Sequence, residues 1–168
     1  MLLPLVFCAG CAHLPESYPP PEQRKPLTLP SPAGFGYFLY TSDPNAGAYL
    51  VRDFTGNPGT PRWAHSHPVL RFFVPAAPRL RFAMEFALPE RTFRETGPVT
   101  LTFRLNGVVF DRHRCETPGQ QHYLHDVPPG LVRGSAINLV AIDPDPVWVS
   151  KDDGDRLGFI MTRAGFTE

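Results

Sequence analysis

The fold class is decided by residues 99–110, which read VTLTFRLNGVVF. Leu101, Phe103 and Leu105 alternate with polar residues, and this period of two is typical of a strand that buries one face. The pair Asn-Gly follows at 106–107 and is the strongest short signal for a tight hairpin turn. Apolar residues then begin the return strand. The stretch therefore predicts two antiparallel strands joined by a two-residue turn.

The same alternation recurs along the chain. Residues 80–86 alternate between large apolar and polar or small side chains. Residues 137–142 are apolar on both faces apart from Asn138, as expected of a central strand. An Asp-Asp-Gly turn separates the apolar stretches 147–149 and 157–161, which predicts a second hairpin. Further candidate strands are residues 37–40, 48–54 and 69–74. About nine short strands without a long helix predict two packed antiparallel sheets.

Composition agrees with this fold class and excludes several functions. The chain has 168 residues, with 21 prolines and 14 glycines, which argues against a helical bundle. Its 16 basic and 16 acidic residues cancel, so we expect no nucleic-acid partner. A hydrophobic content of 42% is sufficient for a core and excludes wholesale disorder. We expect an all-β chain with a single antiparallel β-sandwich over residues 34–168.

The N-terminal residues contain a candidate localisation signal. Residues 1–10, MLLPLVFCAG, are apolar and end in small residues, as a signal peptide does. The stretch Cys8-Ala9-Gly10-Cys11 resembles the bacterial lipoprotein box. That resemblance implies a lipid on Cys11 and cleavage of the signal peptide before it. The alternative is that the stretch is the apolar N-terminus of a cytosolic protein.

A proline-rich segment follows the candidate lipidation site. Residues 12–32 contain seven prolines, which is typical of an extended, semi-rigid spacer. We therefore expect a signal peptide over 1–10, a lipidated Cys11 with a tether to residue 33, and then the β-sandwich. This order predicts a lipoprotein of the bacterial cell envelope, anchored to the membrane and facing the periplasm or the exterior.

The sandwich resembles a known family of modules. The motifs that carry this resemblance are residues 49–53, 62–63, 99–107, 118–119, 127–128, 131–134 and 138–140. In this order they are similar to galactose-binding-domain-like jelly rolls, over about residues 45–166. The resemblance implies a jelly roll of about eight strands. It leaves the ligand open, because this fold serves many functions.

Aromatic side chains are the first candidates for a ligand site. The resemblance to this family implies that a sugar would stack on the exposed face of a Trp or Tyr ring. The candidates are Trp63, Tyr123 and Trp148. Trp148 lies between Val147 and Val149, so its ring faces away from theirs. If the valines are buried, Trp148 is exposed and available. If the sheet is covered on both sides, Trp148 belongs to the core.

Acidic residues near the C-terminus are candidates for a metal site. A calcium ion takes about six to eight oxygen ligands, and the carboxylates of this cluster could contribute. The candidate ligands are Asp143, Asp145, Asp152 and Asp153. Their alternative role is structural, because Asp-Asp-Gly forms turns and Asp-Pro pairs form stiff connectors. Apart from this candidate structural calcium, we expect no cofactor.

We found no motif for catalysis. The chain has no serine in a glycine-flanked elbow and no glycine-rich phosphate loop before a helix. We therefore expect a binding module without catalytic activity, with carbohydrate as its ligand. One alternative is an assembly lipoprotein that contacts only other envelope proteins. A second is a small enzyme with a site of another kind.

The lipidation hypothesis makes a direct prediction. Acyl chains contribute about 0.8 kcal/mol per buried methylene, so a doubly or triply acylated protein stays in the membrane. Replacing Cys11→Ala removes the acceptor thiol and should move the full-length protein from the membrane fraction to the soluble fraction. An unchanged distribution after fractionation would refute lipidation of Cys11.

Overall fold

The computed structural model describes residues 36–77 and 79–168. The predicted signal peptide, the lipidated Cys11 and the tether to residue 33 all lie outside this part of the chain. Within the described residues, none of the helices has the length and apolar character needed to cross a membrane.

Antiparallel strands dominate the described residues. The elements are β1 (Phe38–Tyr40), a 3-10 turn (Ala46–Ala48), β2 (Leu50–Thr55), β3 (Arg62–Val74), β4 (Arg81–Leu88), α1 (Glu90–Thr96), β5 (Val99–Leu105), β6 (Val108–Cys115), β7 (Gly119–Asp126), β8 (Ala136–Asp145), β9 (Trp148–Val149), β10 (Arg156–Leu157) and β11 (Phe159–Thr167). The all-β prediction is confirmed, and the domain is an antiparallel β-sandwich of the jelly-roll type.

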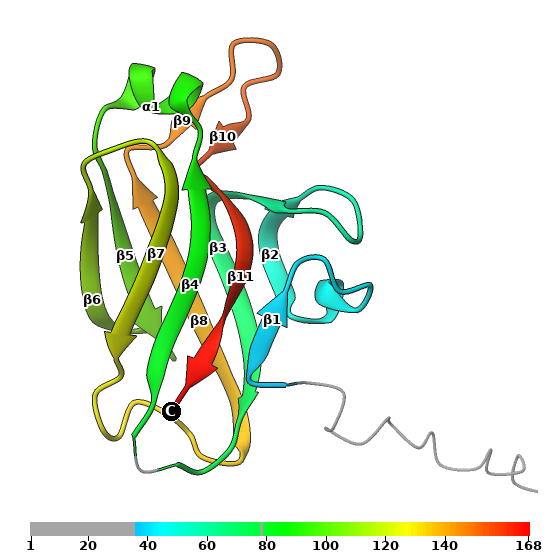
Figure 1. The fold of residues 1–168 in the computed structure, drawn as a ribbon, viewed down its shortest axis with the longest axis vertical. Helices are drawn as coiled ribbons and strands as arrows, with labels where there is room; N and C mark the ends of the chain where they lie inside the picture. Colours follow the sequence, from blue (N-terminus) through cyan, green and yellow to red (C-terminus); the bar gives the residue numbers. More distant parts are fainter. Residues whose placement is uncertain (1–35, 78) are drawn as a thin grey trace, which may run out of the picture. The chain divides into compact units, whose positions relative to one another are not determined.

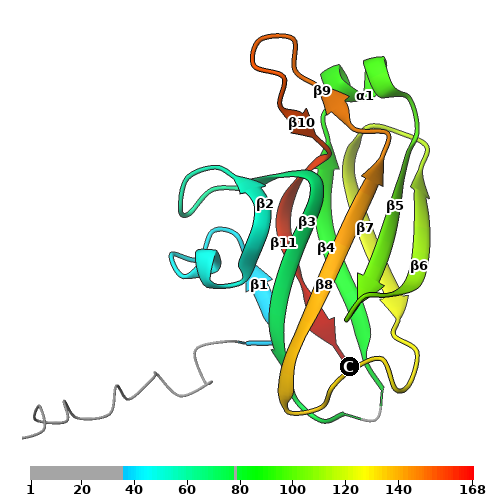
Figure 2. The ribbon, with the colours of Figure 1, turned by 180° about the vertical axis from the view of Figure 1, so that it is seen from behind.

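The strands form two layers that share one strand. The first layer has the order β6-β5-β8-β3, with β2 beside β3. The second layer has the order β11-β4-β7, with β1 beside β11. Residues 69–74 of β3 pair with β8, whereas residues 62–64 pair with β11. The two views show β4 and β11 on one side, with β8 and the later part of β3 on the other (Figures 1 and 2).

The core lies between the two layers and consists mainly of phenylalanine rings. The ring centroid of Phe82 on β4 lies 5.4 Å from that of Phe166 on β11. Phe72 on β3 approaches the same two rings edge-on, at 6.2 and 5.7 Å. All three side chains are fully buried. Edge-to-face ring pairs of this kind add to the free energy of burial, so this cluster holds the layers together.

The predicted hairpin at residues 99–110 is confirmed. Leu105 pairs with Val108, and Asn106 and Gly107 both have positive φ, as a primed turn requires. The second predicted hairpin is shorter than expected. Only β9 and β10 pair there, because the chain from Phe159 onward enters the large sheet as β11.

A buried asparagine explains the polar interruption in the central strand. Asn138 is fully buried, and its amide nitrogen donates to the carbonyl oxygens of Arg133 and Ala136. Its amide oxygen accepts hydrogen bonds from the backbone N–H of Arg133 and from the side chain of Asn106. The two asparagines therefore hold the loop before β8 against the β5–β6 turn.

The sequence pattern did not predict β7. Its inward side chains, Tyr123 and His125, form a polar cluster with Asp111 on β6 instead of an apolar row. The Tyr123 hydroxyl donates to Asp111 at 2.7 Å, and the nearest His125 nitrogen is 3.4 Å from the same carboxylate oxygen. This cluster connects the outer strands of the two layers without a hydrophobic alternation that a sequence pattern could reveal.

Replacing Asn138→Ala should lower the free energy of unfolding by about 2–4 kcal/mol, because buried backbone groups lose their partners. Chemical denaturation measures this change. The matched control is Leu139→Ser, because Leu139 is the exposed neighbour of Asn138 on β8. A variant of Asn138 as stable as the wild type would contradict the structural role of this side chain.

Candidate functional site

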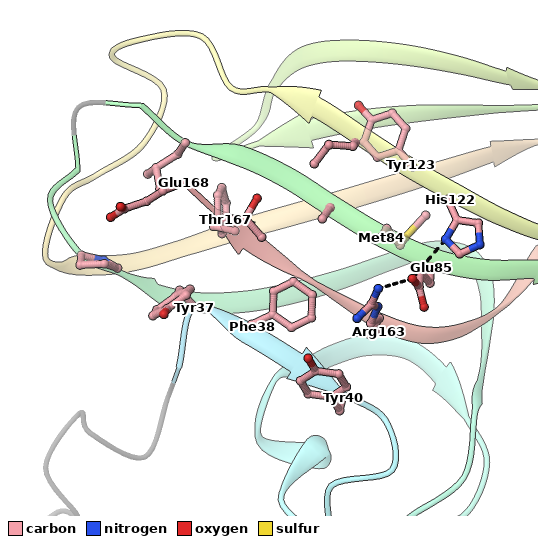
Figure 3. A pocket seen from close by; sticks show the side chains of 15 residues that line it. Tyr37, Phe38, Tyr40, Met84, Glu85, His122, Tyr123, Arg163, Thr167 and Glu168 are labelled. Carbon is pink, nitrogen blue, oxygen red and sulfur yellow. Dashed lines mark hydrogen bonds and ion pairs between the residues drawn. The ribbon is translucent and has the colours of Figure 1, made fainter.

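A groove of about 820 Å³ lies on the outer face of the second layer, over β7, β4, β11 and β1. Figure 3 shows the side chains that line it. Aromatic side chains come from β1 and from Tyr37 just before it, whereas Arg163, Glu85 and His122 come from β11, β4 and β7. The groove lies in the part of the chain that the structure describes, and no catalytic motif of the sequence marks its position.

The floor of the groove follows from the pleat of β4. Phe82, Met84 and Phe86 point into the core, so the residues between them point outward. These residues are Ala83 and Glu85. The small Ala83 leaves space above the sheet, and Glu85 places a carboxylate at the centre of the groove.

A close approach between two strands brings aromatic rings to the groove. Leu39 of β1 is buried, so Phe38 and Tyr40 point outward. Phe38 pairs with Gly165 on β11, where a Cβ atom would lie only 2.5 Å from the Phe38 Cα. Glycine at this position therefore permits β1 to lie against β11. Tyr37 and Tyr40 each keep 52% of their surface exposed.

Three charged or polar side chains cross the groove in register. Arg163 on β11 lies opposite Glu85 on β4, which lies opposite His122 on β7. Oε1 of Glu85 accepts a hydrogen bond from the Arg163 guanidinium and lies 3.1 Å from Nδ1 of His122. Figure 3 shows Arg163 and His122 converging on Glu85. The register of β11 against β4 shifts between Met161 and Arg163, which is the position of a β-bulge.

This arrangement keeps Glu85 and Arg163 charged. The hydrogen bond from Arg163 lowers the pKa of Glu85, and Glu85 in turn raises the pKa of Arg163. The Arg163 guanidinium carbon also lies 6.0 Å from the centre of the Phe38 ring, at the limit of a cation–π contact. The groove thus combines an ion pair, an imidazole and aromatic rings.

The structure does not gather the three predicted aromatic candidates on one surface. Tyr123 borders the groove but is only 4% exposed, and its ring stacks on Phe103 at 4.0 Å. Burial and the hydrogen bond to Asp111 raise its pKa. Trp63 and Trp148 are half-buried and do not line the groove, and the Trp148 indole donates to Glu95 at 3.0 Å. A sugar platform at either Trp stays a prediction.

The acidic candidates are dispersed. Asp143 accepts a hydrogen bond from Arg104 at 3.0 Å and lies 3.1 Å from His67. Burial opposes ionisation of Asp143, but these two partners outweigh it and lower its pKa. Asp145 ends β8, and Asp152 and Asp153 lie in the exposed turn before β10. Across residues 36–77 and 79–168, no three His, Cys, Asp or Glu side chains are placed together to hold a metal ion. A calcium ion at these aspartates stays a prediction.

Apart from Tyr123, sequence reasoning missed the aromatic, charged and imidazole side chains on which the site depends. They are Tyr37, Phe38, Tyr40, Glu85, His122 and Arg163. Residues 37–40 and 80–86 were predicted as strands, so the outward direction of Glu85 was available from the alternation. What was missing was the pairing that places these strands side by side.

Comparisons with known proteins give only distant likenesses. No protein-family model matches the chain, and no curated protein matches it either. A family 35 carbohydrate-binding module from an environmental isolate is 11% identical, with a TM-score of 0.48, over 79% of this chain and 93% of that chain. A second module of family 35, solved with a disaccharide containing glucuronic acid, is 12% identical, with a TM-score of 0.47, over 79% and 94%.

An enzyme gives a similar likeness over a small part of its length. A family GH115 4-O-methyl-α-glucuronidase with specificity for decorated arabinogalactans is 15% identical, with a TM-score of 0.45. The match covers 71% of this chain but only 16% of that enzyme. At such identities the ligand must be inferred from the residues of this chain itself.

Proposed function

We propose that the domain is a non-catalytic carbohydrate-binding module whose ligand lies in the groove over β7, β4, β11 and β1. One observation carries the proposal: exposed aromatic rings and an in-register Arg–Glu–His row line the same groove. Its volume of about 820 Å³ is within the range of small-molecule sites, about 300–1,000 Å³.

A sugar ring has groups that match both the aromatic and the hydrogen-bonding side chains of the groove. A pyranose presents C–H groups on one face, which pack on aromatic rings, and hydroxyl groups around its edge. Tyr37 and Tyr40 offer the aromatic surface. Arg163 donates hydrogen bonds, Glu85 accepts them, and His122 keeps its Nε2 atom for a ligand. Hydroxyls can pair with both kinds of group at once.

The length of the groove supports an oligosaccharide ligand. Its lining extends along the chain from Leu80 to Glu85. With a rise of about 3.3 Å per residue, this stretch extends about 17 Å. That length exceeds a single sugar ring, so the ligand that we propose is a short segment of a glycan chain.

The electrostatics favour binding over hydrolysis. Glycoside hydrolysis uses a carboxylic acid whose pKa is raised, so that it can donate a proton to the leaving group. Arg163 lowers the pKa of Glu85, which keeps this carboxylate ionised and unsuited to the role of general acid.

The proposed setting follows from the N-terminal sequence. A lipid on Cys11 and the proline-rich tether would hold the module near a bacterial membrane, where envelope polysaccharides are within reach. The competing proposal is a module that contacts only envelope proteins, and an absence of glycan binding would favour it.

The variant Tyr40→Ala should weaken glycan binding about tenfold, because the sugar loses an aromatic face. The measurement is binding of the full-length chain in detergent to an array of neutral and acidic oligosaccharides. The matched control is Trp148→Ala, which removes an aromatic ring outside the groove, and thermal unfolding checks that both variants fold. If Trp148→Ala abolishes binding and Tyr40→Ala does not, the groove is not the site.

A further inference from the structure

We infer that the groove selects uncharged sugars over acidic ones, and that Glu85 is the residue that determines this preference. The inference rests on the proposed carbohydrate-binding function and specifies the class of sugar that the groove accepts. Three observations support it: the balance of charge in the groove, the pairing of its one arginine, and the hydrogen-bonding capacity that Glu85 has left.

The groove has no surplus of positive charge. Among the described residues that line it, Arg163 is the one permanently cationic side chain, whereas Glu85 and Glu168 are both anionic. Even if His122 is counted as a cation, the basic side chains of the lining do not outnumber the two acidic ones. A sugar carboxylate entering the groove would therefore meet a surface that is neutral to negative.

The arginine that would recognise a carboxylate is already occupied. Arg163 forms an ion pair with Glu85, and the two lie opposite each other on neighbouring strands. An acidic sugar would have to displace Glu85 from Arg163 or bind beside two anionic groups. Placing like charges next to each other is a recognised means of rejecting a wrong ligand.

Glu85 also favours hydroxyl groups directly. The hydrogen bond from Arg163 and the contact with His122 both use Oε1. Within the described residues, Oε2 has no hydrogen-bond partner, so it can accept a hydrogen bond from a ligand. A sugar hydroxyl can donate that bond, whereas an ionised sugar carboxylate has no proton to donate. The same side chain thus attracts the neutral sugar and repels the acidic one.

The test uses matched pairs of ligands. The probes are cellotetraose, mannotetraose and galactotetraose, each compared with its counterpart whose C6 hydroxyls have been oxidised to carboxylates. Isothermal titration with the full-length protein in detergent gives the affinity for each member of a pair. We expect the wild type to bind the neutral member at least tenfold more tightly than the acidic one.

The variant Glu85→Gln identifies the residue responsible. Glutamine has the size of glutamate but lacks its charge, so Arg163 becomes available for a sugar carboxylate. We expect the preference for the neutral member to fall at least tenfold or to reverse. The matched control is Asp143→Asn on β8, because Asp143 likewise contacts an arginine and a histidine but lies outside the groove. This control should keep the wild-type preference.

The remaining outcomes would contradict either the inference or the proposed function. Equal or tighter binding of the acidic members by the wild type would overturn the inference, and so would an unchanged preference in a folded Glu85→Gln variant. If no member of any pair binds, the proposed carbohydrate-binding function itself fails.

Discussion

The pleat of β4 is the constraint on which both the core and the groove depend. Successive residues of a strand must face opposite sides, so burying Phe82, Met84 and Phe86 forces Ala83 and Glu85 outward. The buried residues bind the two layers together through the phenylalanine cluster. A shift of one residue in β4 would expose this cluster and remove Glu85 from the groove. Stability of the fold therefore fixes the position of the charged centre.

Two departures from regular strand geometry complete the groove. The shift in register before Arg163 sets the position of its guanidinium opposite Glu85, and Gly165 permits the close approach of β1. Neither feature adds to the apolar core. They bring the aromatic residues of β1 and the ion pair to the same face of the second layer.

The sequence predicted local structure well and the site poorly. The alternation in residues 99–110 and the Asn-Gly turn were sufficient to place β5 and β6. The strand β7 was missed because its inward residues are polar.

The site could not be assembled from the sequence. Glu85 is 78 residues from Arg163 and 37 from His122 along the chain. Alternation predicts to which face a side chain points, but it does not predict which strand lies beside which. The aromatic residues chosen from the sequence could not be ranked because burial depends on that pairing, and Tyr123 proved to be buried.

The central claim is that glycan binds on the outer face of the second layer. Backbone amide chemical shifts, recorded by NMR while cellotetraose, mannotetraose or galactotetraose is added, locate the ligand without any substitution. The account predicts that the largest shifts occur at Tyr37, Tyr40, His122 and Arg163. Shifts concentrated at Trp63 and Trp148, with none in the groove, would contradict it.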